Sequence, residues 1–563
     1  MGLVTRGMAV LLVVLSIAVF LPSLPYIEII SGHEAREGMR LREMVETGHW
    51  LFPEVLRKPP LYYWMSGAIA QLRGGMVDAI SLRLPSALLA SLGVLVVFRL
   101  GRYAATPVGG AWGGVILLTS LLYVQHGHNS RTDMALCVLV TASLLLFFVA
   151  YTRSWRYGRG GGWVPYLFAC CLAGALLSKG PVGVILILLP IVAFLVWRRD
   201  LSGAWPVLRP GPLLTFGVLG GSWYLSALWG AGEEFWHTQI VEENVARFVG
   251  GIDKMSFFYY LGPLLFMFAP WNLFLPAALW RAFKEKEDGP VFLALWWLVL
   301  VLFFQLSAYK RARYLLPAQP ASALLVGWWL ATRLPAATAA VQRWKWRQHG
   351  VVLLAVVAVM AAAVGLLMLW GTSEKELFSC RRLFSFVTRE TQEQIVLYCQ
   401  WLGVHFWVGL AWWDLMALCL FFFLRFLARV RLERALVSLS AALLLVYSAL
   451  YPSWLVVTSW AQSPQTFVRS IVDKIGPGGQ VAFISPFAEK GLPVVFSLQE
   501  QARVTEVQWP WQTPPPPLPT GYYLVSDDRR VEVTSRAPGT WSEVLRDNSP
   551  LDWSLTLFFY QAP

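Results

Sequence analysis

Residues 132–151 read TDMALCVLVTASLLLFFVAY, and this stretch decides the class of fold. Apart from Asp133 at its start, it holds no charged side chain. A run of about 20 such residues is long enough to cross the hydrocarbon core of a bilayer as an α-helix. Comparable runs recur along the chain as far as about residue 455. The sequence therefore predicts an α-helical integral membrane protein.

We expect about 13 transmembrane helices. The predicted spans are 8–24, 82–99, 108–124, 132–151, 163–178, 181–198, 212–230, 258–280, 290–308, 313–331, 351–370, 403–425 and 434–455. The first span follows Arg6 and resembles the apolar part of a signal peptide. Pro22, Pro25 and Tyr26 follow it in place of a small-residue cleavage site, so we interpret it as a retained helix.

The composition indicates the same class. Hydrophobic residues make up 57% of the chain, charged residues only 14%, and the mean hydropathy is +0.55. A soluble protein has about a quarter charged residues. The net charge of +13 would suggest nucleic acid as a partner of a soluble protein. Here the basic residues concentrate in short loops between apolar runs, which is typical of membrane topology, and we expect no nucleic-acid partner.

Lysine and arginine gather in every second loop between the predicted spans. The first of these loops holds Arg99 and Arg102, and the last holds Arg425 to Arg434. Because cytoplasmic loops carry the excess of basic residues, we place the N-terminus inside. An odd number of spans then places the C-terminal part of the chain outside.

Two domains are expected from this pattern. Residues 1–455 form the membrane domain, in which 25–81 is a long first outside loop. Residues 456–563 form a small soluble α/β domain. Its strand-like runs are 480–484, 493–498, 522–525 and 555–560. Cys380 and Cys399 share another outside loop and are candidates for a disulfide in an oxidising compartment.

Some basic residues break the topology pattern because they lie in predicted outside loops. They are Lys58, Arg131, Lys179, Lys310, Arg311 and Arg313. One basic residue in an outside loop needs no special function, because a long side chain at a helix end can extend its charge to the membrane surface. Their recurrence in four separate loops favours a binding site for an anion, and phosphate suits both Arg and Lys. A phosphate carried by a membrane lipid would lie at this depth.

Acidic residues accompany this basic set. Glu34 and Glu37 follow the first span within His33-Glu-Ala-Arg-Glu37, and Asp133 begins the fourth. A carboxylate at the membrane surface can act as a general base for an acceptor group. The basic cluster would stabilise a departing phosphate. The alternative, that these are solvated charges at helix ends, fits the spacing equally well.

Several short motifs follow one another in a specific order. They are Gly32-His-Glu-Ala-Arg36, Arg42-Glu-Met44, Glu46-Thr-Gly-His-Trp50, Lys58-Pro-Pro-Leu-Tyr-Tyr-Trp64, Arg83-Leu-Pro-Ser86, Arg131-Thr-Asp133, Ser178-Lys-Gly-Pro181 and Arg313-Tyr-Leu-Leu-Pro317. Over residues 8–330 this succession resembles the GT-C class of polyprenyl-phosphate-sugar glycosyltransferases. The nearest members are the bacterial aminoarabinose lipid A transferase and the protein O-mannosyltransferases. Each motif alone is weak, and the shared order makes the resemblance specific.

The resemblance implies an inverting enzyme of the bacterial inner membrane, with its active site on the periplasmic side. It would move a sugar from an undecaprenyl-phosphate or similar polyprenyl-phosphate donor to a lipid A-like, glycan or protein acceptor.

Carried over to this chain, the motifs assign roles to individual residues. The catalytic carboxylates would be Glu34 and Asp133. The residues that bind the donor phosphate would be Lys58, Lys179, Lys310, Arg311 and Arg313. Supporting residues would be His33, Arg36, Arg131, Arg247 and Tyr314, with Arg247 in the pattern Glu243-x-x-x-Arg247-Phe248.

This chain departs from the family pattern at two places. The family motif in the first loop reads Asp-Glu-x-Arg, and His33 stands here in place of the Asp. The acid/base role would then pass to Glu34, or the activity would be altered. The metal positions of the lipid A enzyme correspond to Arg57 and Asn244, neither of which suits zinc, so we expect no metal and no other cofactor.

Two other functions fit the same composition. A polyprenyl-linked saccharide transporter or flippase would also combine many spans with charged residues at membrane depth. The sequence shows no internal repeat of the kind common in transporters, which favours the transferase. The replacement of the Asp by His33 keeps a third hypothesis open, a degenerate relative that only binds lipid.

Overall fold

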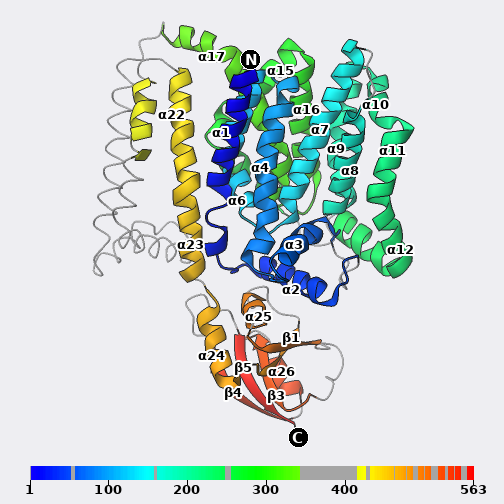
Figure 1. Cartoon of the computed structure of the whole chain (residues 1–563), viewed down its shortest axis with the longest axis vertical. Coiled ribbons are helices and arrows are strands. Elements are labelled where there is room, and N and C mark those ends of the chain that lie inside the picture. Colours follow the sequence, from blue (N-terminus) through cyan, green and yellow to red (C-terminus); the bar gives the residue numbers. More distant parts are fainter. Residues whose placement is uncertain are drawn as a thin grey trace.

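The structure is a computed structural model. It describes residues 2–51, 58–157, 162–246, 255–342, 415–416, 418–426, 432–461, 463–476, 478–485, 492–499, 501–508, 518–526, 530–537, 539–546 and 555–562. The predicted span 351–370, most of the span 403–425, and Cys380 and Cys399 lie outside these residues. Figure 1 shows a bundle of long helices with a small sheet domain beyond one of its ends.

Six helices in the described part of the chain are long and apolar enough to cross a membrane. They are Arg6–Tyr26, Ala79–Ala104, Thr132–Arg153, Pro181–Arg198, Asp288–Leu306 and Glu433–Val456. Two bent helix pairs raise the number to eight if each pair counts as one span: Pro107–Leu118 with Leu121–Gly127, and Phe257–Phe266 with Trp271–Glu285. The predicted class, a helical protein that crosses the membrane several times, is confirmed.

The bundle and its connections contain many elements. They are α1 (Gly2–Phe20), α2 (Gly32–Thr47), α3 (Leu61–Leu72), α4 (Ala79–Ala104), α5 (Pro107–Leu118), α6 (Leu121–Gly127), α7 (Thr132–Tyr157), α8 (Val164–Lys179), α9 (Pro181–Arg198), α10 (Trp205–Leu208), α11 (Pro210–Phe216), α12 (Ser222–Phe235), η4 (Trp236–Ala246), α14 (Leu261–Phe266), α15 (Leu275–Glu285), α16 (Asp288–Leu306), η7 (Ala312–Ala318), α17 (Gln319–Gln342), α22 (Leu432–Leu445) and α23 (Tyr451–Ala461).

Helix α7 lies at the centre of the bundle. Its apolar segment is 94% buried inside the protein, against 56% or less for the other five spans. It packs against α4, α8 and α9. Near its far end the rings of Phe148 and Phe292 stack with centroids 5.0 Å apart, and Phe194 meets Phe292 edge-on at 5.2 Å. Such packing fixes the helix rigidly, and Asp133 in its first turn is fixed with it.

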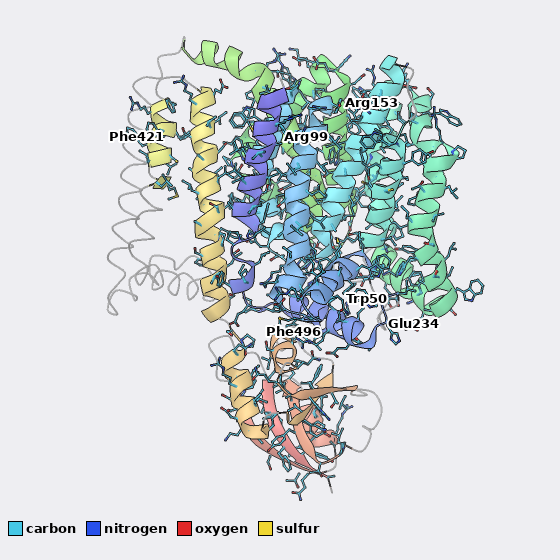
Figure 2. All side chains as sticks on the ribbon, in the orientation of Figure 1. Trp50, Arg99, Arg153, Glu234, Phe421 and Phe496 are labelled. Carbon is cyan, nitrogen blue, oxygen red and sulfur yellow. The ribbon has the colours of Figure 1, made fainter. Side chains whose placement is uncertain are left out.

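The two ends of the bundle carry different elements. Figure 2 shows Arg99 and Arg153 at the end where the N-terminus lies, and Trp50 and Phe496 at the opposite end. Helices α2 and α3 lie across that opposite end (Figure 1), which we call the α2 end. The basic residues of separate predicted inside loops therefore share one end of the bundle, as alternating topology requires.

The C-terminal part of the chain is a mixed sheet with helices packed on it. Its elements are α24 (Gln465–Ile475), β1 (Gln480–Ser485), α25 (Leu492–Leu498), β2 (Arg503–Gln508), β3 (Gly521–Ser526), α26 (Arg530–Arg536), β4 (Thr540–Arg546) and β5 (Leu555–Gln561). The strand order is β2-β1-β3-β5-β4. Strand β1 pairs parallel with β2 and β3, while β5 pairs antiparallel with β3 and β4.

One strand prediction in this part is wrong. Residues 493–498 were expected to be extended, and they belong to helix α25, which is buried along its whole length. A short apolar run that is covered on every side shows no periodicity, so it cannot be told from a buried strand by sequence. Pro493, at the start of the run, occupies a position in the first helical turn that proline favours.

Helix α25 joins the sheet domain to α2. Phe496 packs in one apolar cluster with Leu41 and Met44 of α2. The Arg42 guanidinium lies 4.3 Å from the centre of the Phe496 ring and donates to the Phe496 carbonyl oxygen at 3.1 Å. A Cβ atom on Gly38 would lie only 2.5 Å from the Phe496 ring. The absence of a side chain at Gly38 therefore allows α25 to contact the α2 backbone.

We expect Gly38→Ala to destabilise this contact by about 1–3 kcal/mol, because the added methyl group overpacks the junction. Thermal unfolding in detergent and protease protection of residues 456–563 would measure the effect. The double variant Gly38→Ala with Phe496→Leu should recover much of the loss. Gly262→Ala is the matched control, since a Cβ there has open space around it. Equal stability of Gly38→Ala and the control would contradict the described packing.

Candidate active site

Glu34 and Arg83 form a buried ion pair between α2 and α4. Arg83 Nη2 lies 2.5 Å from Glu34 Oε2, and Arg83 Nε lies 3.1 Å from Glu34 Oε1. The backbone N–H of Ser130 also donates to Oε1, at 2.9 Å. Burial alone would raise the pKa of Glu34, but the Arg83 charge and these hydrogen bonds outweigh it and lower the pKa. The Glu34 carboxylate is therefore ionised, and both of its oxygens accept hydrogen bonds. The Glu34–Arg83 pair is thus a structural contact between the first loop and the bundle.

A second carboxylate of α2, Glu37, holds Lys58 in place. Lys58 Nζ lies 2.5 Å from Glu37 Oε1, the Tyr63 hydroxyl donates to Oε2, and Arg40 approaches to 3.6 Å. Burial opposes ionisation of Glu37, yet the Lys58 charge prevails and lowers the pKa of Glu37 to about 2. Glu37 was not assigned a role from the sequence. Its place one turn after His33 on the same helix face was the available signal.

His33 lies beside this pair. Its Nε2 is 3.3 Å from Lys58 Nζ and 3.8 Å from Glu37 Oε1. Burial, then the Lys58 charge, lowers the pKa of His33 to about 3, so the ring is neutral near pH 7. Because Lys58 donates to Nε2, the ring proton sits on Nδ1. That buried Nδ1 has no hydrogen-bond partner among the residues that the structure describes.

The third carboxylate, Asp133, pairs with two cations. Lys179 Nζ donates to Asp133 Oδ1, and Arg313 Nε lies 3.6 Å from Oδ2. Lys179 also lies 5.1 Å from the centre of the Tyr314 ring. Asp133 is 5% exposed. Residues from α7, α8 and η7 therefore meet at one point, although they are widely separated in the sequence.

A cavity of about 390 Å³ opens beside these groups. Lys58 and Lys179 both line it, which joins the two cationic sites. Its other polar lining includes Gln239, Glu243 and Asn244. Its apolar lining comes from Leu136, Val182, Ile185, Leu186, Phe303 and Phe304. A cationic region beside an apolar wall suits an amphiphile with an anionic head.

The other predicted residues contribute unequally. Lys310 is buried and donates to the Ser307 carbonyl oxygen at 2.6 Å, so it lies behind a residue that lines the cavity. Arg311 donates to the Tyr309 hydroxyl at 2.9 Å. Neither lines the cavity. Arg131 lies two residues before Asp133, and Arg36 is half-buried on α2. Arg247 and Arg57 lie outside the described residues.

A metal site does not fit the described groups at the cavity. Zinc prefers thiolate, imidazole and carboxylate ligands. Among the described residues that line the cavity, Glu243 alone has such a side chain, beside the amides of Gln239 and Asn244 and the cation of Lys58. Across the described ranges, no three or more His, Cys, Asp and Glu side chains are arranged to hold a metal ion.

Known proteins resemble this chain in sequence. Residues 57–219 match the family described as dolichyl-phosphate-mannose-protein mannosyltransferase. The undecaprenyl phosphate-alpha-4-amino-4-deoxy-L-arabinose arabinosyl transferase of Erwinia tasmaniensis is 29% identical over 310 residues, which cover 52% of this chain and 54% of that protein. An uncharacterised protein of Aquifex aeolicus is 30% identical over 311 residues, 53% of this chain and 68% of that protein. In this part of its sequence the chain therefore resembles the GT-C class of polyprenyl-phosphate-sugar glycosyltransferases.

The fold of the chain is similar to that of a solved structure. The crystal structure of ArnT from Cupriavidus metallidurans bound to undecaprenyl phosphate has a TM-score of 0.71 with it, over 98% of each chain at 19% identity. Matches to the first two curated arabinosyl transferases span about half of their length, 54% and 52%. The resemblance inferred from the order of the motifs is confirmed.

We expect Arg83→Ala to destabilise the protein by about 3–5 kcal/mol, because it leaves the Glu34 carboxylate buried without its partner. Denaturant titration of the purified protein would measure this loss. The control is Arg73→Ala, which breaks a half-exposed pair with Asp78 and should cost less than about 1 kcal/mol. Losses of the same size in both variants would contradict a buried, fully paired Glu34.

Acid should destabilise the site through His33 first. Between pH 6.5 and about 3 the unfolded chain binds a proton at His33 that the folded chain excludes, so stability falls as the pH falls. Glu37, with a depressed pKa of about 2, contributes its full stability above pH 4.5 and loses it only below. The thermal midpoint should therefore fall less between pH 7 and pH 5 in His33→Gln than in the unchanged protein. An equal fall would show that His33 titrates normally.

Proposed function

We propose that this chain transfers a sugar from a polyprenyl-phosphate donor to an acceptor at the α2 end of the bundle. The observation that carries the proposal is the cavity in which Lys58 and Lys179 lie beside an apolar wall. The acceptor is a lipid A-like molecule, a glycan or a protein. The named activities of the curated relatives support this class of donor.

The donor fits the cavity in one direction. Its phosphate lies between the two lysines, each of which supplies a positive charge and hydrogen-bond donors. Its prenyl chain lies along Ile185 and Leu186 of α9 and Phe303 and Phe304 of α16. Ile185 is 40% exposed, so the apolar wall continues to the surface that faces lipid.

Donor binding exchanges the partners of the lysines. In the described structure, Glu37 neutralises Lys58 and Asp133 neutralises Lys179. A phosphate that enters the cavity competes with both carboxylates for these cations. Asp133 then has an oxygen available to orient the acceptor or to accept its proton, while Arg313 keeps the second oxygen.

The transfer breaks the bond between the sugar C1 and the phosphate oxygen, and the acceptor oxygen forms a new bond to C1. The electron pair of the broken bond stays on the phosphate, where Lys58 and Lys179 stabilise it. Of the two carboxylates proposed from the sequence, Asp133 is the one that pairs with a lysine of the cavity lining, Lys179. Glu34, with both oxygens occupied, serves to position α2.

The cellular arrangement is part of the same proposal. The α2 end faces the periplasm, the N-terminus lies on the cytoplasmic side of a bacterial inner membrane, and the membrane domain 1–455 has about 13 spans. Residues 456–563 form the periplasmic domain. The alternation of basic loops supports this orientation.

We expect Lys58→Ala and Lys179→Ala each to raise the donor KM by roughly 10- to 100-fold, since each removes a charged hydrogen bond of about 1.5–3 kcal/mol. The measurement follows label from polyprenyl-phosphate sugar to an acceptor in detergent or vesicles. Lys284→Ala, an exposed lysine beside Trp280, is the control and should leave the KM unchanged. An unchanged donor KM in both cavity variants would contradict the phosphate site. Label that crosses the vesicle without reaching an acceptor would support the transporter.

A further inference from the structure

A second cavity lies at the end of the bundle opposite the candidate active site. Its volume is about 690 Å³, and Arg153 on its wall lies at the end that holds the N-terminus (Figure 2). Asp133 and Arg153 belong to the two ends of α7, which are about 30 Å apart along the helix. The cavity is therefore separate from the one that Lys58 and Lys179 line.

The walls of this second cavity are the ends of four membrane-spanning helices. The residues of its lining at which these spans end or begin are Ala104 of α4, Arg153 of α7, Arg198 of α9 and Asp288 of α16. The ends of membrane-spanning helices lie at the level of the lipid head groups, and the cavity therefore lies at that level too. Phosphate groups of lipids are concentrated there.

Close packing fixes the walls of the cavity. A Cβ atom on Gly289 would clash with the carbonyl oxygen of Ala104, so α16 begins in direct contact with the end of α4. Tyr151 of α7 is 3% exposed, and its ring meets the Phe194 ring of α9 edge-on at 5.2 Å. A ligand would therefore enter a space that the helix ends have already formed.

The lining of the second cavity carries an excess of positive charge. Its cations are Arg153, Arg198 and Lys286, and its carboxylates are Glu287 and Asp288. Arg198 Nε pairs with Asp288 Oδ1 at 2.9 Å, whereas Lys286 forms no ion pair with any residue that the structure describes. One positive charge remains in excess, and it favours an anionic ligand.

Lys286 has a backbone conformation that favours glycine. It follows α15 with φ +56°, and within the described ranges the other non-glycine residue with a positive φ is Arg199, which follows α9 with φ +54°. Glycine is the usual residue at such helix ends. A basic residue there interacts favourably with the helix dipole, which applies to both positions equally. The two differ in that Lys286 lines the cavity and Arg199 does not.

We propose that the second cavity binds the phosphate group of an anionic ligand through Arg153 and Lys286. A guanidinium and an ammonium group both donate charged hydrogen bonds to phosphate oxygens. Basic pockets between membrane-spanning helices bind lipid head groups in this way. The phosphate belongs to an anionic phospholipid or to a water-soluble phosphate ester, and the test separates these two sources. Donor binding at Lys58 and Lys179 has no part in the inference.

The test measures how the purified full chain in detergent binds short-chain phosphatidylglycerol, phosphatidylcholine of the same chain length, and glycerol phosphate. Phosphatidylglycerol should bind more tightly than phosphatidylcholine, because only its head group has a net negative charge. Lys286→Gly and Arg153→Gln should each weaken the binding of phosphatidylglycerol by roughly three- to tenfold. Binding of phosphatidylglycerol without glycerol phosphate would assign the site to a lipid. Glycerol phosphate that binds and is weakened by the same variants would assign it to a soluble phosphate ester.

Arg199→Gly is the matched control. It removes a positive charge from a helix end with the same backbone conformation, but outside the cavity lining, so it should leave the binding of phosphatidylglycerol unchanged. Lys286→Gly should not lower thermal stability, because glycine adopts a positive φ without strain. Its effect should persist in a Lys58→Ala background, which separates this site from the donor site. Equal weakening by Arg199→Gly and Lys286→Gly, unchanged binding in Lys286→Gly and Arg153→Gln, or equal affinity for the two lipids would overturn the proposal.

Discussion

The Glu34–Arg83 pair is the contact on which the described site depends. It lies where the first loop returns to the bundle, and Arg83 also donates to the carbonyl oxygens of Ile27 and Glu28. The Arg83 guanidinium thus contacts both the segment that follows α1 and the first turn of α2. The bidentate geometry allows little rotation of the helix. The direction of α2 then determines where Glu37, one turn further along, presents its carboxylate.

In the proposed function, the site consists of cations that carboxylates hold until the donor phosphate arrives. Glu37 holds Lys58 and Asp133 holds Lys179, so neither lysine is buried with an uncompensated charge. The cost of burying these lysines is met in advance, and their positions are fixed before the donor enters. A phosphate needs only to exchange one set of oxygens for another. Such an exchange keeps the number of ion pairs nearly constant, which favours both binding and release.

The sequence allowed these cations and carboxylates to be named, but not which of them pair with one another. Lys58, Lys179 and Arg313 stood out because they break the alternation of basic loops, and that signal needs no knowledge of the fold. The partner of Glu34 is 49 residues away, and no local spacing indicates it. Lys310 and Arg311 carried the same signal as Arg313. In the described structure, Lys310 contacts a backbone carbonyl and Arg311 a tyrosine, so only Arg313 reaches a site carboxylate.

The sheet domain has a place in this arrangement because it also packs on α2. Arg83 binds Glu34 in the first turn of the helix, while Phe496 of α25 contacts Gly38 and Arg42 one and two turns further along. The contact with α25 adds a further restraint on the direction of α2. The Phe496 side chain of α25 occupies the space that the missing side chain of Gly38 leaves. The error in assigning 493–498 as a strand therefore concealed the contact by which the C-terminal domain reaches the site.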